Sequence, residues 1–186
     1  MSHSVQTETI NGLDMKILQE TIGAIKQDPG LGMCHFRARN KWNGGSQNRT
    51  TIRNFYAAKE EHAHKKLFKL DCDEPPMLAG SDDAPNPVEH LLNALAGCVT
   101  TSMVAHAAAR GIHISELESE LEGDIDLRGF LGLDPNVPKG YTAIRVKFRV
   151  KTDEKDLDRL KSLAQFSPVL NTLTHEVPVE VTIEPK

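Results

Sequence analysis

The sequence has no excess of basic residues. Its 22 Lys and Arg are outnumbered by 26 Asp and Glu, which gives a formal net charge of -4 at pH 7. The basic residues are spread along the chain, so the electrostatic footprint that a nucleic-acid-binding protein carries is missing. We therefore expect no nucleic-acid partner.

Cysteine is also scarce. The chain has 3 cysteines, Cys34, Cys72 and Cys98, at irregular spacing and without a CxxC pair. An odd number at such spacing fits neither a disulfide framework nor a zinc site. A reducing environment is the simpler setting, so we expect a cytoplasmic protein that holds neither a metal nor an organic cofactor.

Secretion and membrane signals are missing as well. The first ten residues, MSHSVQTETI, have neither the basic start nor the apolar core of a signal peptide, so we expect the mature chain to begin here. Residues 91–109 approach the length of a membrane span, but they are rich in Ala and include five polar side chains. These are Asn93, Thr100, Thr101, Ser102 and His106. The stretch predicts a buried core helix, and we expect no membrane partner.

The first part of the chain predicts one helix and three strands. Residues 11–28 carry apolar side chains at alternating spacings of three and four, which indicates an amphipathic helix that ends at the DPG sequence. Three runs rich in aromatic and β-branched residues follow, and NGGSQN supplies a turn between the first two. We expect antiparallel strands at 34–42, 49–57 and 64–71.

The remainder predicts a long helix followed by mixed elements. Asn86 is a suitable N-cap, Pro87 suits the first helical position, Glu89 favours the helix dipole, and Gly111 ends the run. Alternation with a period of two, and then helical spacing, mark the elements that follow. These are strands within 114–127 and 141–151, helices within 153–166 and 167–173, and a final strand at 177–184. The predicted fold class is α+β, and the length of 186 residues fits one domain.

Cys98 is the candidate reactive thiol. It lies in the middle of the long helix, between Ala96, Gly97 and Val99, small residues that would let another segment approach the sulfur. A thiol becomes reactive where cations or a helix N-terminus favour the thiolate, and early-strand arginines and the turn at Ser167 are candidate sources. From the residues alone, a small inert core cysteine is the commoner outcome.

The run NPVEHLLNALAGCVTTSMVAHAAARGI resembles the signature helix of the OsmC/Ohr family, where NP, an acidic residue, LL, an Ala-rich step and the reactive Cys recur in that order. FRARNKWNGGSQNRTTI, DEPPMLAGSDDAPNPVE and SPVLNTLTHEVPVEVTIE extend the resemblance. It implies an OsmC-like domain at 33–186, preceded by an N-terminal helical extension at 1–32. The implied fold has two antiparallel-sheet halves wrapped around long central helices in an intertwined homodimer, with the thiol sites at the subunit interface.

The resemblance also implies a chemistry and its residues. Cys98 matches the position that attacks the peroxide O–O bond and becomes a sulfenic acid. Ser167 stands where the family has its second, resolving Cys. Val88 stands at the family's catalytic carboxylate, and Glu89 follows one position later, about 100° around the helix. Arg39 and Arg49 are the candidates for the arginine that holds the thiolate, with Arg49 slightly preferred because it follows the GG turn.

Histidines offer two weaker signals. His62 and His64, near the acidic run DCDE at 71–74, could suggest a metal cluster, but their spacing fixes no third ligand, and a charged hairpin is the better interpretation. His106 follows Cys98 by eight residues, roughly 12 Å along a helix, which is too far for a direct Cys–His pair. We expect His106 to be a polar helix residue at the dimer interface.

Two functions follow. The first is a thiol peroxidase that reduces organic hydroperoxides through Cys98, with an external thiol as reductant in place of the missing second Cys. The alternative is a non-catalytic dimer whose cavity binds a small apolar ligand, with Cys98 in a packing or sensing role. A folded dimer that has lost its chemistry is a third possibility.

Overall fold

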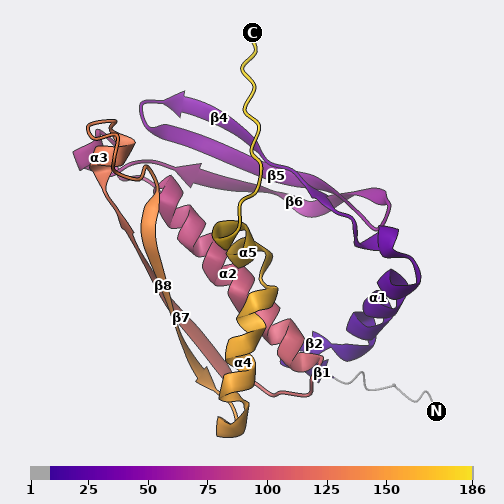
Figure 1. The fold of residues 1–186 in the computed structure, drawn as a ribbon. Coiled ribbons are helices and arrows are strands. Elements are labelled where there is room, and N and C mark those ends of the chain that lie inside the picture. Colours follow the sequence, from indigo (N-terminus) through magenta and orange to yellow (C-terminus); the bar gives the residue numbers. More distant parts are fainter. Residues whose placement is uncertain (1–8, 186) are drawn as a thin grey trace, which may run out of the picture. The chain divides into compact units, whose positions relative to one another are not determined.

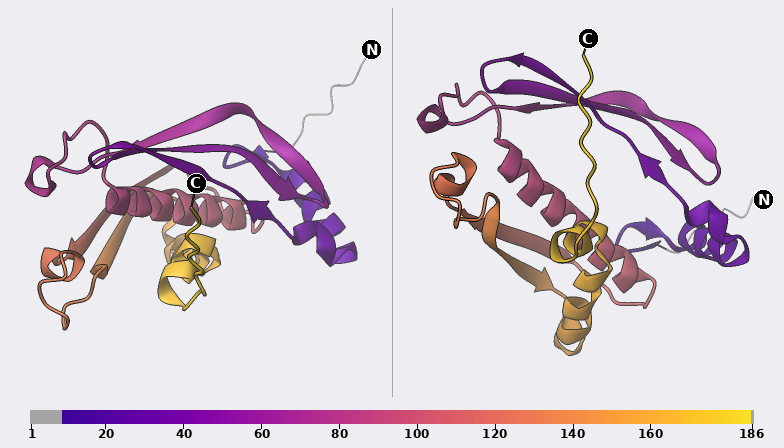
Figure 2. Two further views of the ribbon diagram at one scale, coloured as in Figure 1. Left: turned by 90° about the horizontal axis from the view of Figure 1, so that it is seen from above. Right: turned by 45° about the horizontal axis from the view of Figure 1, so that its top comes forward.

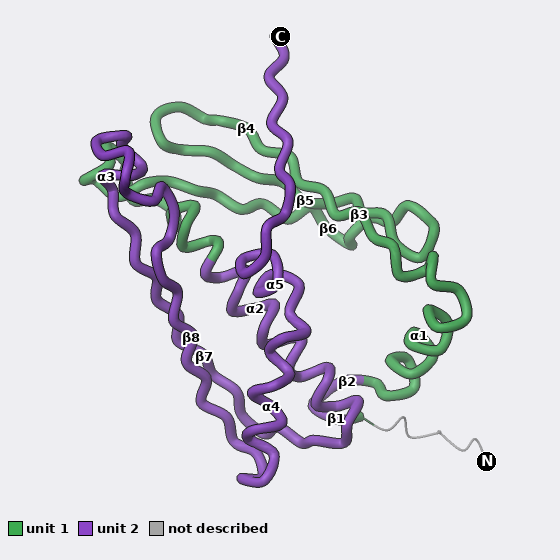
Figure 3. The backbone as a smooth tube through the Cα atoms, in the orientation of Figure 1, with its two compact units in different colours: residues 1–9, 14–91 green, residues 10–13, 92–186 purple. Residues whose placement is uncertain are grey.

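The computed structural model describes residues 9–185. The described chain divides into two compact units (Figure 3). The first comprises residues 9 and 14–91, and the second comprises residues 10–13 and 92–185. The expected boundary at residue 32, between an N-terminal helical extension and the following domain, is a different division and stays a prediction.

Helix α1 (Met15–Gln27) opens the first unit after the two-residue strands β1 (Thr9–Ile10) and β2 (Leu13–Asp14). The Asp14 side chain caps the helix by accepting from the Ile17 amide at 3.1 Å. The helix ends at Gln27 with Asp28 as its C-cap, and Pro29–Gly32 form a 3-10 turn, which confirms the predicted stop at the DPG sequence. The predicted start at residue 11 is wrong, because residues 11–14 belong to the turn and second strand of the β1–β2 hairpin. The β1–β2 hairpin was not predicted, because four strand residues are too few to show a period.

An antiparallel sheet with β5 (Gln47–Ala57) at its centre completes the first unit (Figure 1). β3 (His35–Phe36) and β4 (Arg39–Gly44) pair with one edge of β5, and β6 (Glu60–Cys72) pairs with the other. The three predicted strand regions are confirmed, except that the first is interrupted at residues 37–38. Gly44 and Gly45 have φ angles of +114° and +55°, which explains why glycines occupy the β4–β5 turn.

The buried carboxylate of Asp73 anchors the loop that follows β6. Asp73 is 1% exposed. Its oxygens accept from two side chains and three backbone amides: Ser46 Oγ (2.5 Å), Gln47 Nε2 (3.4 Å), and the N–H groups of Glu74 (2.8 Å), Ser81 (3.2 Å) and Asp83 (3.2 Å). These donors favour the ionised form and hold the pKa of Asp73 well below its usual range.

We expect Asp73→Asn to lower the melting temperature at pH 7. We also expect the melting temperature of the variant to fall less than that of the wild type as the pH is lowered. Because the pKa of Asp73 is lower in the folded state, its stabilising contribution is complete above the unfolded carboxyl pKa of about 4 and decreases as the pH falls below that value. The difference in melting temperature between wild type and variant should therefore narrow from pH 5 to pH 3, as measured by circular dichroism. Asp82→Asn, at an exposed position of the same loop, is the control. A difference that stays constant over this range would contradict the prediction.

The second unit is built on α2 (Pro87–Ala108), which begins in the first unit and continues into the second. Leu95, Val99, Met103 and Ala107 form a buried stripe at spacings of four, so the predicted helix is confirmed and this face of it lies in the core. Only 28% of its most apolar 18-residue stretch is buried in the described chain. By length and composition alone α2 could cross a membrane. The same apolar composition is also explained by a helix that buries one face in a protein core, as the buried stripe of α2 does.

A hairpin and three helices accompany α2 in the second unit (Figures 1 and 2). β7 (Glu116–Ile125) and β8 (Tyr141–Lys151) pair antiparallel, with Glu116 opposite Lys151 at one end. The short helix α3 (Leu127–Phe130) follows β7 and was not predicted. Helices α4 (Leu157–Leu163) and α5 (Pro168–Thr174) confirm the two predicted helices, and Leu160 and Leu163 of α4 join the core. The mixture of helices and antiparallel strands confirms the α+β class.

The predicted final strand at 177–184 is wrong for the described chain. Residues 176–185 have no strand hydrogen bonding and are drawn as an extended trace in Figure 1. Val179, Val181 and Ile183 are 82%, 79% and 93% exposed. Alternating apolar residues form a strand only where a neighbouring strand offers its backbone groups, and no described strand pairs with this segment.

Candidate functional site

The thiol of Cys98 is half-buried on α2 and meets the start of α5. The Val169 N–H points to Cys98 Sγ at an N···S distance of 3.5 Å. Val169 lies in the first turn of α5, where backbone N–H groups carry partial positive charge and have no intrahelical acceptor. The Cys98 sulfur therefore accepts a hydrogen bond from a backbone N–H at the start of a helix.

Ser167 holds the turn that presents Val169 to the sulfur. It is 0% exposed, and its Oγ accepts from the Leu170 N–H at 3.2 Å, which confirms the predicted N-cap. Its own N–H donates to the Ala164 carbonyl at 3.0 Å. The structure therefore brings the neighbourhoods of two predicted site residues, Cys98 and Ser167, together within the second unit.

The small residues before Cys98 do not receive another segment in the described chain. A Cβ added at Gly97 would meet nothing within 4 Å. The nearby Thr101 hydroxyl donates back to the carbonyls of Gly97 (2.8 Å) and Cys98 (3.2 Å). The expected close approach to the sulfur is made by the start of α5 at Val169, whereas Gly97 itself meets no other segment among the described residues.

Glu89 forms a capping box with Asn86. The Asn86 N–H donates to Glu89 Oε2, and the Glu89 N–H donates to Asn86 Oδ1, both at 2.9 Å. This reciprocal pair satisfies backbone donors at the start of α2. The arrangement confirms the predicted N-cap and gives the Glu89 carboxylate a structural role.

We expect Glu89→Ala to lower the free energy of unfolding by about 0.5–1 kcal/mol, the usual contribution of a helix cap. Glu89→Gln should lose less, because a glutamine can complete a capping box. Urea unfolding measures both values, and a peroxide assay of the Cys98 thiol serves as the second readout. Loss of thiol reactivity in Glu89→Gln without loss of stability would show that the carboxylate takes part in the chemistry.

The two candidate arginines differ in their pairing. Arg49 on β5 and Asp71 on β6 are cross-strand neighbours, and the guanidinium binds the carboxylate in a bidentate pair at 2.5 and 2.9 Å. The pairing raises the pKa of Arg49 and lowers that of Asp71. Arg39 is exposed, and its side chain has no ion pair among the described residues. Both arginines belong to the first unit and Cys98 to the second, so their approach to the sulfur stays a prediction.

Cys72 lies in surroundings that disfavour a thiolate. Burial raises the pKa of the Cys72 thiol, and the carboxylates of Asp71 and Glu74 raise it further. Cys34 is exposed, and its thiol donates weakly to the Gly32 carbonyl at 3.8 Å. All three cysteines are free thiols in the structure. Of the three, only Cys98 accepts a backbone N–H in the described chain.

The predicted histidine features are packing groups. The His62 ring stacks on Phe55 at a centroid distance of 5.2 Å, and the His64 ring lies tilted against Phe55 at 4.9 Å. The described residues hold no group of three possible metal ligands. His106 stacks on Phe166 at 4.0 Å. Burial and the neighbouring Arg110 guanidinium lower the pKa of His106, which favours its neutral form.

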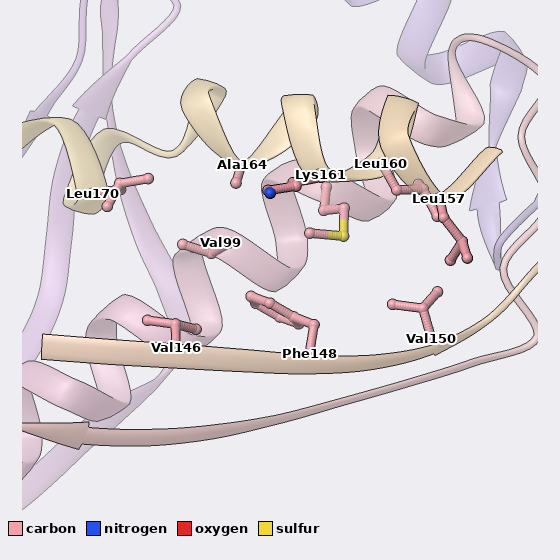
Figure 4. A pocket seen from close by; sticks show the side chains of 10 residues that line it. Val99, Val146, Phe148, Val150, Leu157, Leu160, Lys161, Ala164 and Leu170 are labelled. Atoms are coloured by element: carbon pink, nitrogen blue, oxygen red, sulfur yellow. The ribbon is translucent and has the colours of Figure 1, made fainter.

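A cavity of about 400 Å³ lies within the second unit (Figure 4). Val146, Phe148 and Val150 of β8 line one side. Side chains of α2 and of the segment 157–170 line the other, among them Val99, which follows Cys98, and Leu170, which follows Val169. The alternation on β8 and the helical spacing of α4 are both visible in the sequence. The sequence does not show that these two elements face each other, so sequence reasoning missed this cavity.

Comparisons with known proteins agree with this architecture. The family model for OsmC-like proteins matches residues 80–182. A search of curated proteins found no significant match. Among solved structures, an OsmC-like protein of Vibrio cholerae superposes with a TM-score of 0.57 at 12% identity, covering 75% of this chain and 94% of that one. An OsmC-like protein of Mycoplasma pneumoniae gives 0.55 at 18% identity, covering 75% and 86%.

A third solved structure is the organic hydroperoxide resistance protein OsmC of Legionella pneumophila, with a TM-score of 0.53, 18% identity, and coverage of 74% of this chain and 89% of that one. At these identities the likeness shows the fold, and it confirms the predicted OsmC-like fold. The family model covers more than half of the chain and includes α2 with Cys98. The chain therefore belongs to the OsmC-like protein family.

Proposed function

We propose that this protein reduces organic hydroperoxides through Cys98, with an external thiol as the reductant. The observation that carries the proposal is the Val169 N–H directed at the half-buried Cys98 sulfur at 3.5 Å. Family membership supports a redox role in general terms. The Legionella neighbour named as an organic hydroperoxide resistance protein supports the choice of oxidant.

The chemistry begins with attack of the Cys98 thiolate on the terminal peroxide oxygen. The S–O bond forms as the O–O bond breaks, so the sulfur is oxidised to a sulfenic acid and the peroxide leaves as an alkoxide, which takes up a proton to become the alcohol. The N–H of Val169 stabilises the thiolate before the attack. The N···S distance of 3.5 Å is short enough for this N–H to donate a hydrogen bond to the sulfur.

The external reductant follows from Ser167. A serine hydroxyl cannot form a disulfide, so in this proposal a thiol from outside the chain forms a mixed disulfide with Cys98 as the sulfenic acid releases water. A second external thiol then attacks the external sulfur of the mixed disulfide and frees Cys98. The products are one alcohol, one water and one external disulfide for each hydroperoxide.

The test is a free-thiol count on reduced protein before and after one equivalent of cumene hydroperoxide, with dimedone to trap the sulfenic acid. We expect the loss of one thiol per chain and a dimedone adduct at Cys98. Cys98→Ser should lose no thiol, whereas Cys34→Ser and Cys72→Ser should react like the wild type. An unchanged thiol count over minutes would exclude the peroxidase function.

The homodimer is part of the same proposal. The β7–β8 hairpin has no further strand on either edge among the described residues, so both of its outer edges present backbone groups with which a strand of another chain could pair. Residues 177–184 alternate apolar and polar side chains and have no strand partner in the described chain. A second copy would supply such a partner, and the edge tolerates Pro178 because proline is accepted in edge strands.

A further inference from the structure

The cavity of the second unit has the size and lining of a ligand site. Its volume of about 400 Å³ falls within the range of small-molecule pockets, roughly 300–1,000 Å³. A dry cavity of about 150 Å³ already accommodates a benzene ring. β8 contributes a wall of Val146, Phe148 and Val150, whose side chains all point toward the facing helices in Figure 4. The wall therefore favours an aliphatic chain over a polar molecule.

Lys161 is the only charged residue among those that line the cavity. The other nine lining residues are apolar. The Lys161 ammonium has no ion pair or hydrogen bond within the part of the chain that the structure describes, although Arg159 on the same helix is paired with Asp156 at 2.6 Å. Lys161 is an exposed residue, and Figure 4 shows its nitrogen among the side chains that line the cavity. A cation at one point of an apolar cavity fits an amphiphile with a single anionic head.

We propose that this cavity binds a medium-chain aliphatic carboxylate. The chain lies between β8 and the facing helices, and the carboxylate forms an ion pair with Lys161. The alkyl stem of Lys161 adds to the apolar lining while its ammonium remains hydrated in the free protein, which is the usual arrangement of lysines beside apolar surface. The inference goes beyond the proposed peroxidase, because the carboxylate binds through Lys161 and not through the sulfur.

The cavity and the thiol share neighbours. Val99 follows Cys98 on α2, and Leu170 follows Val169, whose N–H meets the sulfur. Neither Cys98 nor Ser167 lines the cavity. Cys98→Ser is therefore expected to bind the carboxylate like the wild type, so a failure of the peroxidase proposal and a failure of this one are distinguishable.

The experiment is isothermal titration of the full-length protein with decanoate and, separately, with 1-decanol. We expect one decanoate per chain in saturable binding. Lys161→Gln should weaken the binding of decanoate by roughly tenfold, the value of one charge-assisted hydrogen bond at the lower end of its range, and leave that of decanol unchanged. Lys147→Gln is the matched control, because Lys147 lies on β8 between two lining residues and its side chain points to the opposite face.

Ala164→Phe provides a second test, because the larger side chain would occupy the cavity and weaken the binding of decanoate and of decanol alike. Circular dichroism establishes that this variant is folded, and Lys161→Gln decides the question if it is not. Saturable binding of neither ligand would overturn the proposal and leave a second copy of the chain as the occupant of this apolar surface. Equal decanoate affinity in wild type and Lys161→Gln would overturn it as well.

Discussion

Ser167→Cys is expected to convert the peroxide-oxidised form of Cys98 from a sulfenic acid into an intramolecular disulfide. The backbone at residue 169 touches the Cys98 sulfur at 3.5 Å, and residue 167 is the buried N-cap of the same short helix. A sulfenic acid condenses with a thiol that can reach it and loses water. In the wild type this turn offers the sulfenic acid a hydroxyl and backbone groups but no thiol. Without an external thiol, excess peroxide is therefore expected to oxidise Cys98 further to the sulfinic acid.

Intact-protein mass spectrometry after peroxide treatment measures the outcome. The wild type should gain two oxygen atoms irreversibly, whereas Ser167→Cys should lose two hydrogen atoms and recover fully on treatment with dithiothreitol. Ser162→Cys, which adds a thiol at an exposed position of α4, is the matched control and should over-oxidise at Cys98 like the wild type. If Ser167→Cys also gains oxygen at Cys98, then the two side chains do not meet the geometric requirement for a disulfide, a Cβ–Cβ distance of about 3.5–4.5 Å.

The disulfide in oxidised Ser167→Cys is also expected to raise the melting temperature. An unstrained disulfide between positions 98 and 167 would close a long loop, and such cross-links stabilise a protein by roughly 2–4 kcal/mol through the unfolded state. The oxidised variant should therefore melt at a higher temperature than its reduced form. A decrease would indicate that the turn at Ser167 must distort to reach the sulfur.

The elements predicted best from the sequence are those fixed by local chemistry. Asn86 and Ser167 mark helix starts because a cap needs only its own side chain and the next three residues. The β8 strand follows from alternation within eleven residues. The β4–β5 turn follows from two glycines that adopt positive φ angles. Each of these signals is complete within one short segment.

What the sequence could not predict depends on distant partners. The Asp73 carboxylate appears as part of a charged run, and nothing local shows that Ser46 and the amides of residues 81 and 83 converge on it. Similarly, the cavity needs β8 and α4 to face each other. Glu89 is a different case: it was a candidate for chemistry because of its type and position, although its spacing from Asn86 is also the local pattern of a capping box.

Val179→Glu combined with Val181→Glu is expected to weaken the proposed dimer at least a hundredfold. The two valines are two residues apart, which would place them on one face if the segment paired as a strand, and they are 82% and 79% exposed in the described chain. If a second copy buries them, each contributes about 1.5–3 kcal/mol, so losing both corresponds to a hundredfold or larger change in the dissociation constant. Buried glutamates would add a desolvation cost.

Thr182→Glu is the matched control, because residue 182 alternates with the valines and faces the other side of the strand. Light scattering coupled to size exclusion over a range of concentrations should give a dimer for wild type and control and a monomer for the double variant. A monomeric wild type would exclude the dimer. A dimer that survives the double substitution would show that another surface joins the copies, and the unpaired edges of β7 and β8 would then be the place to substitute next. The alternation at 177–184 favours the first outcome, because an exposed row of apolar residues without a partner in its own chain is stabilised only when it is covered.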